Sequence, residues 1–595
     1  MPGMTTRQDH PPLLLEQCKG VTAHGAMPDV HQSTALFWAV VLLMSILVLL
    51  LDYRPLHDPI ANDAALFSIV AQVVGGETTH PSIDLEHGQG IWHPMLYQLL
   101  LNGLAKAVGS DVIYARILGL GCGLLTASLL AWLVVLMIPG SPLRRWIVVL
   151  AVATYVTNPF GRLGMLHLDI DNTVLPPIML AATGLVVIVS RQKTFRGVPY
   201  LVTLQALGFW AKLTTPLLLP FALAGQMLLE RRGWKSLWLP LGITLGGGML
   251  FYLTWWAYCA AMGYPATIVF AQTMRVLSSK ASEFNVLSTG RFAWGLVYWL
   301  IPAFLLLAVI MTVILIRDRI PCQLRKDLLA PAFLGWSIVV GYLFVGGITF
   351  TIPKYQYPAI PLLSLIVAVA FGAYIKAPAP ILRWAGAILA GLALYYYALG
   401  DPLLHYFYSS RVYLLNMKLS GEMPQEYLRV LLTDLLLVLL PILICAGSAL
   451  FVKREERRSH FVVLLFLVMF GYSMGLGVRQ AQADYVTTYS YGMKGAQEVL
   501  DRLPDGSKVL LYEGAILGPY NAKRVYFIPL EYRSRGRIVH ALQSSDADYF
   551  IAGLPLNTLD QLIELQYDRE LKSVLATQYI ERRLGDFSLY QKRRS

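Results

Sequence analysis

The chain is dominated by long apolar runs that recur between residue 35 and residue 479. A helix needs about 20 largely apolar residues to cross the hydrocarbon core of a bilayer, and these runs approach or reach that length. The composition agrees, because 56% of the 595 residues are hydrophobic and only 14% are charged. Soluble proteins carry about 25% charged residues. The sequence therefore predicts a polytopic α-helical membrane protein.

The hydropathy pattern predicts about thirteen spans: 35–51, 112–138, 146–158, 172–190, 198–211, 214–229, 236–262, 295–316, 328–350, 358–375, 384–399, 429–452 and 461–479. Clusters of Lys and Arg fall in every second loop, which marks the cytoplasmic side. This pattern places residues 1–34 in the cytoplasm and the tail from residue 480 outside the cytoplasmic membrane. We attribute the net charge of +12 to the Lys and Arg clusters in the cytoplasmic loops, which would contact anionic lipid headgroups, and not to nucleic-acid binding.

The tail, residues 480–595, differs in pattern from the rest of the chain. The segments "SKVLLYE", "RVYFIP" and "DADYFIAG" resemble short strands, and "MKGAQEVLDRL" and "NTLDQLIELQY" resemble helices. Their mixture predicts a small α/β domain on the periplasmic face. The chain thus divides into a cytoplasmic tail (1–34), a transmembrane domain (35–479) and this outer domain (480–595).

The first outer loop, residues 52–111, turns back toward the membrane. It contains "HDPIANDAALFSIVAQVVGGE" and then "IWHPMLYQLLLNGLAKAVGSD", whose leucines after Pro94 share one helical face while Gln98, Asn102 and Lys106 share another. This is the pattern of a helix that lies in the membrane interface. Asp63 would then lie near the lipid boundary, either as a helix cap or as a general base or metal-ligating acid.

Three segments together resemble the C-type (GT-C) superfamily of membrane glycosyltransferases. The first is this loop, with an acid soon after the first span and then "WHPMLYQLL". The second, "LGFWAKLTTPLLLPFAL", has a lysine ahead of a Pro-containing span, and the third, "TIPKYQYPAIPLLSL", has a basic residue–Tyr–x–x–Pro–x–x–Pro motif. The nearest relatives in pattern are protein O-mannosyltransferases and lipid A aminoarabinose transferases. Relatives often have Asp-Glu where this chain has Asn62-Asp63-Ala64, Arg in place of Lys354, and a second Pro in place of His93.

The resemblance implies a GT-C fold and an enzyme that takes a sugar from a polyprenyl phosphate at the outer face of the membrane. The acceptor would be an envelope glycolipid, polysaccharide or protein hydroxyl. Lys212 and Lys354 lie on the predicted outer side, against the charge bias, and are candidates to neutralise the departing phosphate. Alternatively, they are lysines that extend from helix ends to the interface. Tyr355 and Tyr357 would orient the donor, or belong to an aromatic belt.

The second outer loop, "GRLGMLHLDIDNT", carries three more candidates. Asp169 and Asp171 form an Asp-x-Asp pair that would hold Mg²⁺ or Mn²⁺ between phosphate oxygens, or would instead cap the next span. His167 beside them, His93 before the interfacial helix and Arg275 in the outer loop 263–294 are expected to contact substrate. That loop would act as a lid over the site, or would be disordered and without function.

Two other functions fit a polytopic protein with this composition. A transporter or flippase of lipid-linked sugars would favour paired halves with broken helices in matching places, and the sequence has no convincing internal duplication. A catalytically silent scaffold of envelope assembly would account for the departure from the acid pair at Asn62–Ala64.

Overall fold

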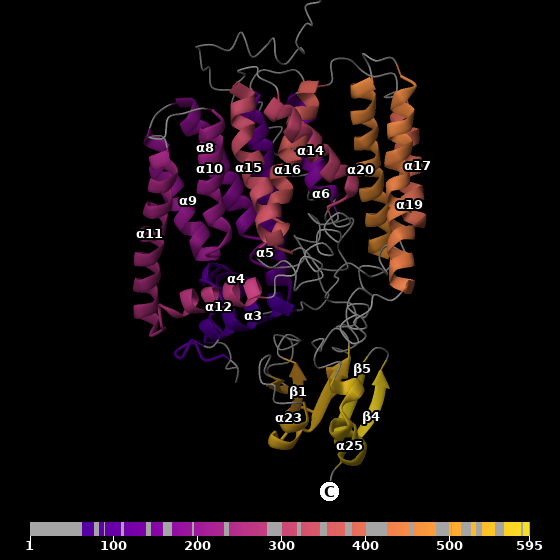
Figure 1. Cartoon of the computed structure of the whole chain (residues 1–595). Helices are drawn as coiled ribbons and strands as arrows, with labels where there is room; N and C mark the ends of the chain where they lie inside the picture. Colours follow the sequence, from indigo (N-terminus) through magenta and orange to yellow (C-terminus); the bar gives the residue numbers. More distant parts are fainter. Residues whose placement is uncertain are drawn as a thin grey trace, which may run out of the picture.

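The computed structural model describes residues 62–76, 83–88, 90–108, 112–138, 144–158, 169–192, 195–230, 237–282, 300–317, 323–344, 354–374, 384–399, 425–452, 457–482, 499–500, 502–512, 525–530, 538–553, 564–584 and 587–593. These residues form a bundle of helices and, at the C-terminal end of the chain, a mixed sheet (Figure 1).

Twelve of the predicted spans coincide with helices, and the first, 35–51, lies outside the described residues. The twelve are α5 (Val112–Met137), α6 (Arg144–Thr157), α8 (Leu175–Gln192), α9 (Val198–Ala211), α10 (Leu218–Leu229), α11 (Trp238–Met262), α14 (Pro302–Arg317), α15 (Gln323–Phe344), α16 (Ala359–Tyr374), α17 (Ala385–Ala398), α19 (Gln425–Leu450) and α20 (Arg457–Gln482). By length and composition, one helix of the described part, Arg116–Met137, is long and apolar enough to cross a membrane, and eight apolar helices are shorter.

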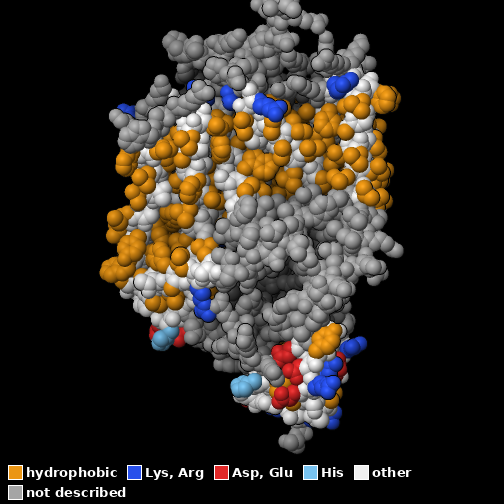
Figure 2. Space-filling view, viewed as in Figure 1, with side chains coloured by type: hydrophobic (Ala, Val, Ile, Leu, Met, Phe, Trp, Pro, Cys, Tyr) orange, Lys and Arg blue, Asp and Glu red, His pale blue; other side chains and the backbone are white. Residues whose placement is uncertain are grey.

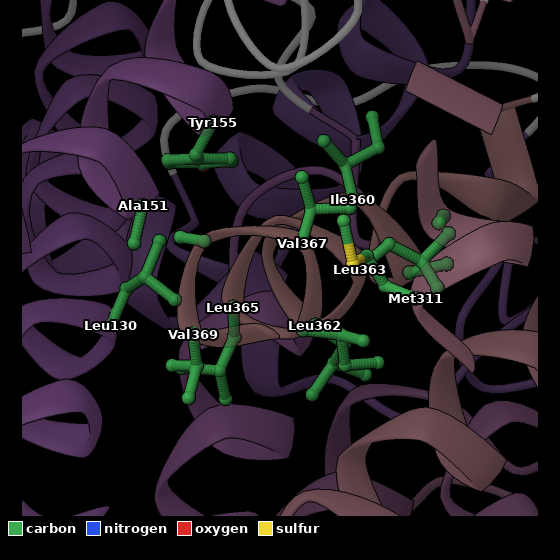
Figure 3. Packing of buried hydrophobic residues seen from close by; sticks show 14 of the residues in the cluster. Leu130, Ala151, Tyr155, Met311, Ile360, Leu362, Leu363, Leu365, Val367 and Val369 are labelled. Carbon is green, nitrogen blue, oxygen red and sulfur yellow. The ribbon is translucent and has the colours of Figure 1, made fainter. Parts of the chain in front are cut away.

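Helix α16 forms the centre of the bundle. It packs against α5, α6, α8, α14 and α15, and its side chains are buried on all sides, as Leu362, Leu363, Leu365 and Val367 at 0% exposure show (Figure 3). A helix that is hydrophobic all round must be enclosed by other helices. The turn that leads into α16 is therefore placed over the middle of one end of the bundle.

The outer surface of the bundle is a broad apolar belt, with Lys and Arg side chains along one rim (Figure 2). Large side chains such as Trp238, Leu245 and Phe221 are 63–70% exposed. Soluble monomers rarely expose contiguous apolar patches larger than a few hundred Å². The belt is the surface that a polytopic membrane fold turns toward lipid.

Basic side chains join the helix ends at this rim. Arg191, near the end of α8, donates to the carbonyl oxygen of Leu136 at the end of α5 (2.7 Å) and to the carboxylate of Asp327 near the start of α15 (3.0 Å). Arg325 donates to the carbonyl oxygen of Leu315 at the end of α14 (2.5 Å). We call this the basic end of the bundle, and the end where α8 and α16 begin the site end.

Helices α17, α19 and α20 form a group beside the main bundle (Figure 1). Helices α17 and α20 approach closely at Gly475, where a Cβ atom would lie 2.2 Å from the carbonyl oxygen of Ala393.

Pro441 within α19 has no N–H to donate to the carbonyl of Leu437. The hydroxyl of Tyr395 on α17 donates to that oxygen instead, at 2.8 Å.

Two helices of the first outer loop, α3 (Asn62–Val74) and α4 (Leu96–Val108), pack against each other at the site end. The predicted interfacial helix is present as α4, but two of the three residues of its polar face point inward, while Lys106 is exposed. Gln98 and Asn102 are buried, and Asn102 Nδ2 donates to the carbonyl oxygen of Ala71 on α3 at 2.8 Å. Leu100, on the apolar face, is 41% exposed. An exposed apolar face of this kind favours contact with lipid over contact with water.

Residues 263–294, expected to be a loop, contain a helix, α12 (Ile268–Ser282). Helix α11 ends at Gly263, whose φ of 73° is in the left-handed region that stops a helix. Trp255 Nε1 then donates to the carbonyl oxygen of Ala266 at 2.9 Å, which turns the chain back. Ile268 packs against Gly88 of the first outer loop. The segment is thus held to the rest of the site end, and its residues 283–294 lie outside the described part.

The C-terminal residues form a five-stranded sheet in the order β2-β1-β3-β5-β4. Its elements are β1 (Ser507–Tyr512), β2 (Val525–Leu530), α23 (Ile538–Ser544), β3 (Tyr549–Gly553), α25 (Arg569–Gln578), β4 (Tyr579–Leu584) and β5 (Phe587–Lys592). Strand β1 runs parallel to β2 and β3, with Val509 opposite Phe527, and β5 runs antiparallel to β3 and β4. The three predicted strands are confirmed as β1, β2 and β3. Figure 1 shows the sheet beyond the site end.

Candidate functional site at one end of the bundle

A buried ion pair links two separate segments at the site end. Helix α9 ends at Ala211, and Lys212 takes an extended conformation that directs the chain out of the helix. Its ammonium nitrogen donates to both carboxylate oxygens of Asp171, at 2.8 and 2.5 Å. Asp171 belongs to the turn that precedes α8. Both side chains are about 95% buried or more, so the pair joins the start of α8 to the end of α9.

Aromatic rings enclose the same lysine. The ammonium of Lys212 lies 4.2 Å from the centre of the Tyr355 ring, within the range of a cation–π interaction. The Tyr355 ring stacks on Tyr342 of α15, with centroids 5.0 Å apart and planes at 16°. Tyr342 Oη lies 2.9 Å from Thr214 Oγ1 and 2.6 Å from Thr215 Oγ1. We call Asp171, Lys212, Thr214, Thr215, Tyr342 and Tyr355 the ion-pair cluster.

The charge of Lys212 is fixed by its neighbours. Burial alone lowers the pKa of the ammonium, but the charge of Asp171 and smaller contributions of Tyr342 and Tyr355 outweigh burial and raise the pKa above its ordinary value. Lys212 lies in the link between α9 and α10, outside either helix. It therefore remains protonated at neutral pH, with Asp171 as its counter-charge.

The Asp169 and Asp171 pair is arranged differently from a metal site. Asp171 gives both oxygens to Lys212, and Asp169 Oδ1 accepts from the backbone N–H of Ile170 at 2.6 Å. A divalent ion at Asp171 would have to displace the ammonium. Within the residues that the structure describes, no three His, Cys, Asp or Glu side chains are grouped as metal ligands. We therefore derive no chemical step through a metal here.

The first outer loop packs onto the segments that carry the ion pair. One hydrophobic cluster contains Phe67 of α3, Tyr97 of α4, Ile170 beside Asp171, and Ala211 beside Lys212. Helix α3 begins at Asn62, which places Asp63 in its first turn. The side chain of Asp63 lies outside the described part. The backbone nevertheless connects this acid to the ion-pair cluster through shared packing.

The motif "KYQYP" lies on the other side of the cluster. Lys354, Tyr355 and Gln356 form the 3-10 turn η6 (Lys354–Gln356), which lies against α15. Tyr357 is buried, and its carbonyl oxygen accepts from the N–H of Ile360 in the first turn of α16. The side chain of Lys354 is not among those described. The turn brings Lys354 and Lys212 to the same end of the bundle, as the sequence predicts.

The other predicted contacts are less closely grouped. The His93 ring packs near Phe67, with centroids 6.1 Å apart. Arg275 is exposed on α12, and His167 lies outside the described residues. His87 forms a local turn with Asp84, whose pKa is held below its ordinary value by the backbone N–H and the ring of His87.

Sequence reasoning missed the residues that complete the cluster. Tyr342 belongs to none of the sequence motifs, Thr214 and Thr215 lie in the segment "LGFWAKLTTPLLLPFAL" but were given no role there, and Asp171 was paired with Asp169. Arg116, within the span of α5, is 1% exposed and was also missed. An ionisable residue inside a predicted span is a signal of function by itself, and Arg116 could have been found on that ground.

Similar proteins are found by structure and not by sequence. No protein-family model and no curated protein matches the chain. The crystal structure of ArnT from Cupriavidus metallidurans bound to undecaprenyl phosphate matches with a TM-score of 0.55 and 14% identity, covering 94% of this chain and 97% of that chain. The apo state of ArnT matches with a TM-score of 0.50 and 14% identity, covering 94% and 98%.

The chain shares the fold of ArnT over nearly the full length of both proteins. The resemblance inferred from the sequence motifs is thus confirmed at the level of the fold.

Proposed function

We propose that this protein is a membrane glycosyltransferase that moves a sugar from a polyprenyl-phosphate donor to a hydroxyl of an envelope acceptor at the outer face of the cytoplasmic membrane. One observation carries the proposal. A fold seen in complex with undecaprenyl phosphate here holds a lysine, a tyrosine motif and an acid-bearing helix together at the end of the bundle opposite the basic rim. Those are the residue types that the reaction needs.

The reaction assigns a role to each group. The acceptor oxygen attacks the anomeric carbon of the donor, and the bond from that carbon to the phosphate oxygen breaks. Polyprenyl phosphate leaves with the bonding electron pair, and the acceptor proton passes to the carboxylate of Asp63. A carboxylate within reach of the acceptor hydroxyl can take its proton as a general base.

Lys354 and Tyr355 are the best candidates to bind the departing phosphate. The positive charge of Lys212 is already balanced by Asp171, so we assign Lys212 to hold Tyr355 and reserve the phosphate contact for Lys354. The turn at Lys354 begins directly before α16, so a phosphate there would lie over the centre of the bundle. Tyr357, His93, His167 and Arg275 remain candidates for donor and acceptor contacts.

The test follows the leaving group. Purified protein in nanodiscs is given a panel of radiolabelled polyprenyl-phosphate sugars with an envelope extract, and release of free polyprenyl phosphate is measured. We expect one donor to be consumed by the wild type, and both Asp63→Asn and Lys354→Gln to lose at least about 100-fold in turnover. A matched Lys106→Gln variant on α4, whose side chain is exposed, should retain it.

Two further arms complete the design. A chelator added in parallel decides whether a divalent ion takes part at Asp169. Tight binding of a donor without release by the wild type, unchanged in Asp63→Asn, would overturn the proposal in favour of transport.

A further inference from the structure

Tyr342 connects the two segments that carry Lys212 and Lys354. Its ring stacks on Tyr355 of the η6 turn at 5.0 Å, and its hydroxyl reaches Thr214 and Thr215 of the link between α9 and α10, at 2.9 and 2.6 Å. The side chain is 8% exposed and Thr215 is fully buried. Tyr342 of α15 thus contacts both segments.

The hydroxyl bonds fix the geometry in a specific way. A tyrosine hydroxyl has one hydrogen, so it donates to at most one of the two threonines and accepts from the other or from both. Both threonines belong to the chain that leaves Lys212, at the start of η3 (Thr215–Leu217). Because a buried hydroxyl without a partner is costly, the three groups hold one another in place. The link after Lys212 is therefore anchored to α15 by these side-chain bonds, in addition to the bond that Gln205 Nε2 of α9 donates to the carbonyl oxygen of Pro216 at 2.8 Å.

The ring contacts fix the other segment. Tyr355 contacts both the Tyr342 ring and the Lys212 ammonium, and the three groups form a triangle, since the ammonium lies 4.2 Å from the Tyr355 ring centre and 5.5 Å from the Tyr342 ring centre. Tyr355 is next to Lys354 in a turn of three residues. Movement of Tyr342 would therefore displace the backbone of Lys354 relative to Lys212.

We propose that Tyr342 is a positioning residue, which sets the separation between the η6 turn and the Lys212 link and so prepares the site for a lipid-linked phosphate. This inference rests on the proposed function. It assigns no contact between Tyr342 and substrate. The hydroxyl acts through Thr214 and Thr215, and the ring acts through Tyr355.

The test separates positioning from stability. Binding of undecaprenyl phosphate to the full-length protein in nanodiscs is measured for wild type and Tyr342→Phe, together with KM and kcat for the active donor. Loss of the two hydroxyl bonds should weaken undecaprenyl phosphate binding and raise KM by about three- to tenfold, with a smaller change in kcat. Combining Tyr342→Phe with Thr214→Val should add little, because both changes break the same network.

A matched tyrosine provides the control. Tyr396 is also buried, donates to the carbonyl oxygen of Val438 at 3.2 Å and packs on Tyr472, but it belongs to the α17 group. Tyr396→Phe should lower the melting temperature by a similar amount and leave binding unchanged. If Tyr342→Phe does not fold, Thr214→Val alone removes one hydroxyl bond and serves the same test.

Each outcome decides a different point. Wild-type binding and turnover with no change of Kd or KM in Tyr342→Phe would overturn the positioning role alone. Absence of both binding and turnover in the wild type would overturn the proposed function and this inference with it.

Discussion

Lys212 and Asp171, 41 residues apart in the sequence, form an ion pair with nitrogen–oxygen distances of 2.8 and 2.5 Å. The pair joins α8 and α9 at the site end, next to the aromatic stack of Tyr342 and Tyr355. Because the pair is buried, the charge of each side chain is stabilised by the opposite charge of the other. A single loss would leave an uncompensated charge inside the protein.

The first prediction tests that dependence. Lys212→Met alone or Asp171→Asn alone should lower the free energy of unfolding by about 3–5 kcal/mol, as is typical when one partner of a buried pair is removed. The double variant should lose less than the sum of the two. Thermal unfolding in detergent measures all three. The matched control is the exposed pair Lys508–Asp546 of the sheet, where Lys508→Met should change little. Additive losses would contradict the coupling.

The second prediction concerns pH. The pKa of Lys212 is raised in the folded protein, so the stability that its charge provides is fully present below the unfolded value of about 10.4 and is lost only as pH rises through the folded value. The difference in melting temperature between wild type and Lys212→Met should therefore be constant from about pH 6 to about pH 9. A difference that disappears within this range would show that the lysine is not held in its charged form.

The third prediction concerns the close approach of α17 and α20. Gly475→Leu should destabilise the protein and reduce its folded yield, because a Cβ atom there would lie 2.2 Å from Ala393 O and 2.8 Å from Tyr397 N. Small residues permit such contacts between membrane helices. Gly391→Ala is the matched control, since its Cβ atom would meet nothing within 4 Å, and it should be neutral or slightly stabilising. Equal effects of the two changes would count against this packing.

The fourth prediction concerns Pro441. Tyr395→Phe should cost about 1 kcal/mol, because the carbonyl of Leu437 loses its hydrogen-bond donor. In a Pro441→Ala background the helix supplies its own N–H to that oxygen, so the same tyrosine change should cost less. A double-mutant cycle by thermal unfolding measures the difference. The interpretation fails if Tyr395→Phe costs the same in both backgrounds.

The helices were the most predictable part of the fold. Span 198–211 was predicted with the bounds that α9 has, Val198–Ala211, since a bilayer imposes a length and polarity that the sequence must show. The bounds of α15 were shifted: 328–350 was expected, but the helix begins at Gln323. Charged residues at its start, Arg325 and Asp327, bind the ends of neighbouring helices and so remain helical.

The site was predictable only in part, because its contacts are long-range. Lys212 and Lys354 stood out as cations against the charge bias, but the sequence held no sign that Asp171 would pair with Lys212 and not act with Asp169. Tyr342 gave no signal, since its role depends on which helix ends meet. Helix α12 was missed because its exposed side carries large apolar side chains such as Phe270 and Met274, which weakens the apolar periodicity of the segment.

The inward-facing polar side of α4 also fixes how deep the protein lies. Leu100 faces outward while Asn102 is tied to α3, so in a bilayer the edge of the acyl chains would lie along α4. Helix α3, with Asp63 in its first turn, is held at a constant height relative to that edge. A thinner or thicker membrane would therefore shift the headgroups of bound lipids relative to the site, because the protein fixes the position of α3. Turnover of a lipid substrate would then depend on the thickness of the bilayer.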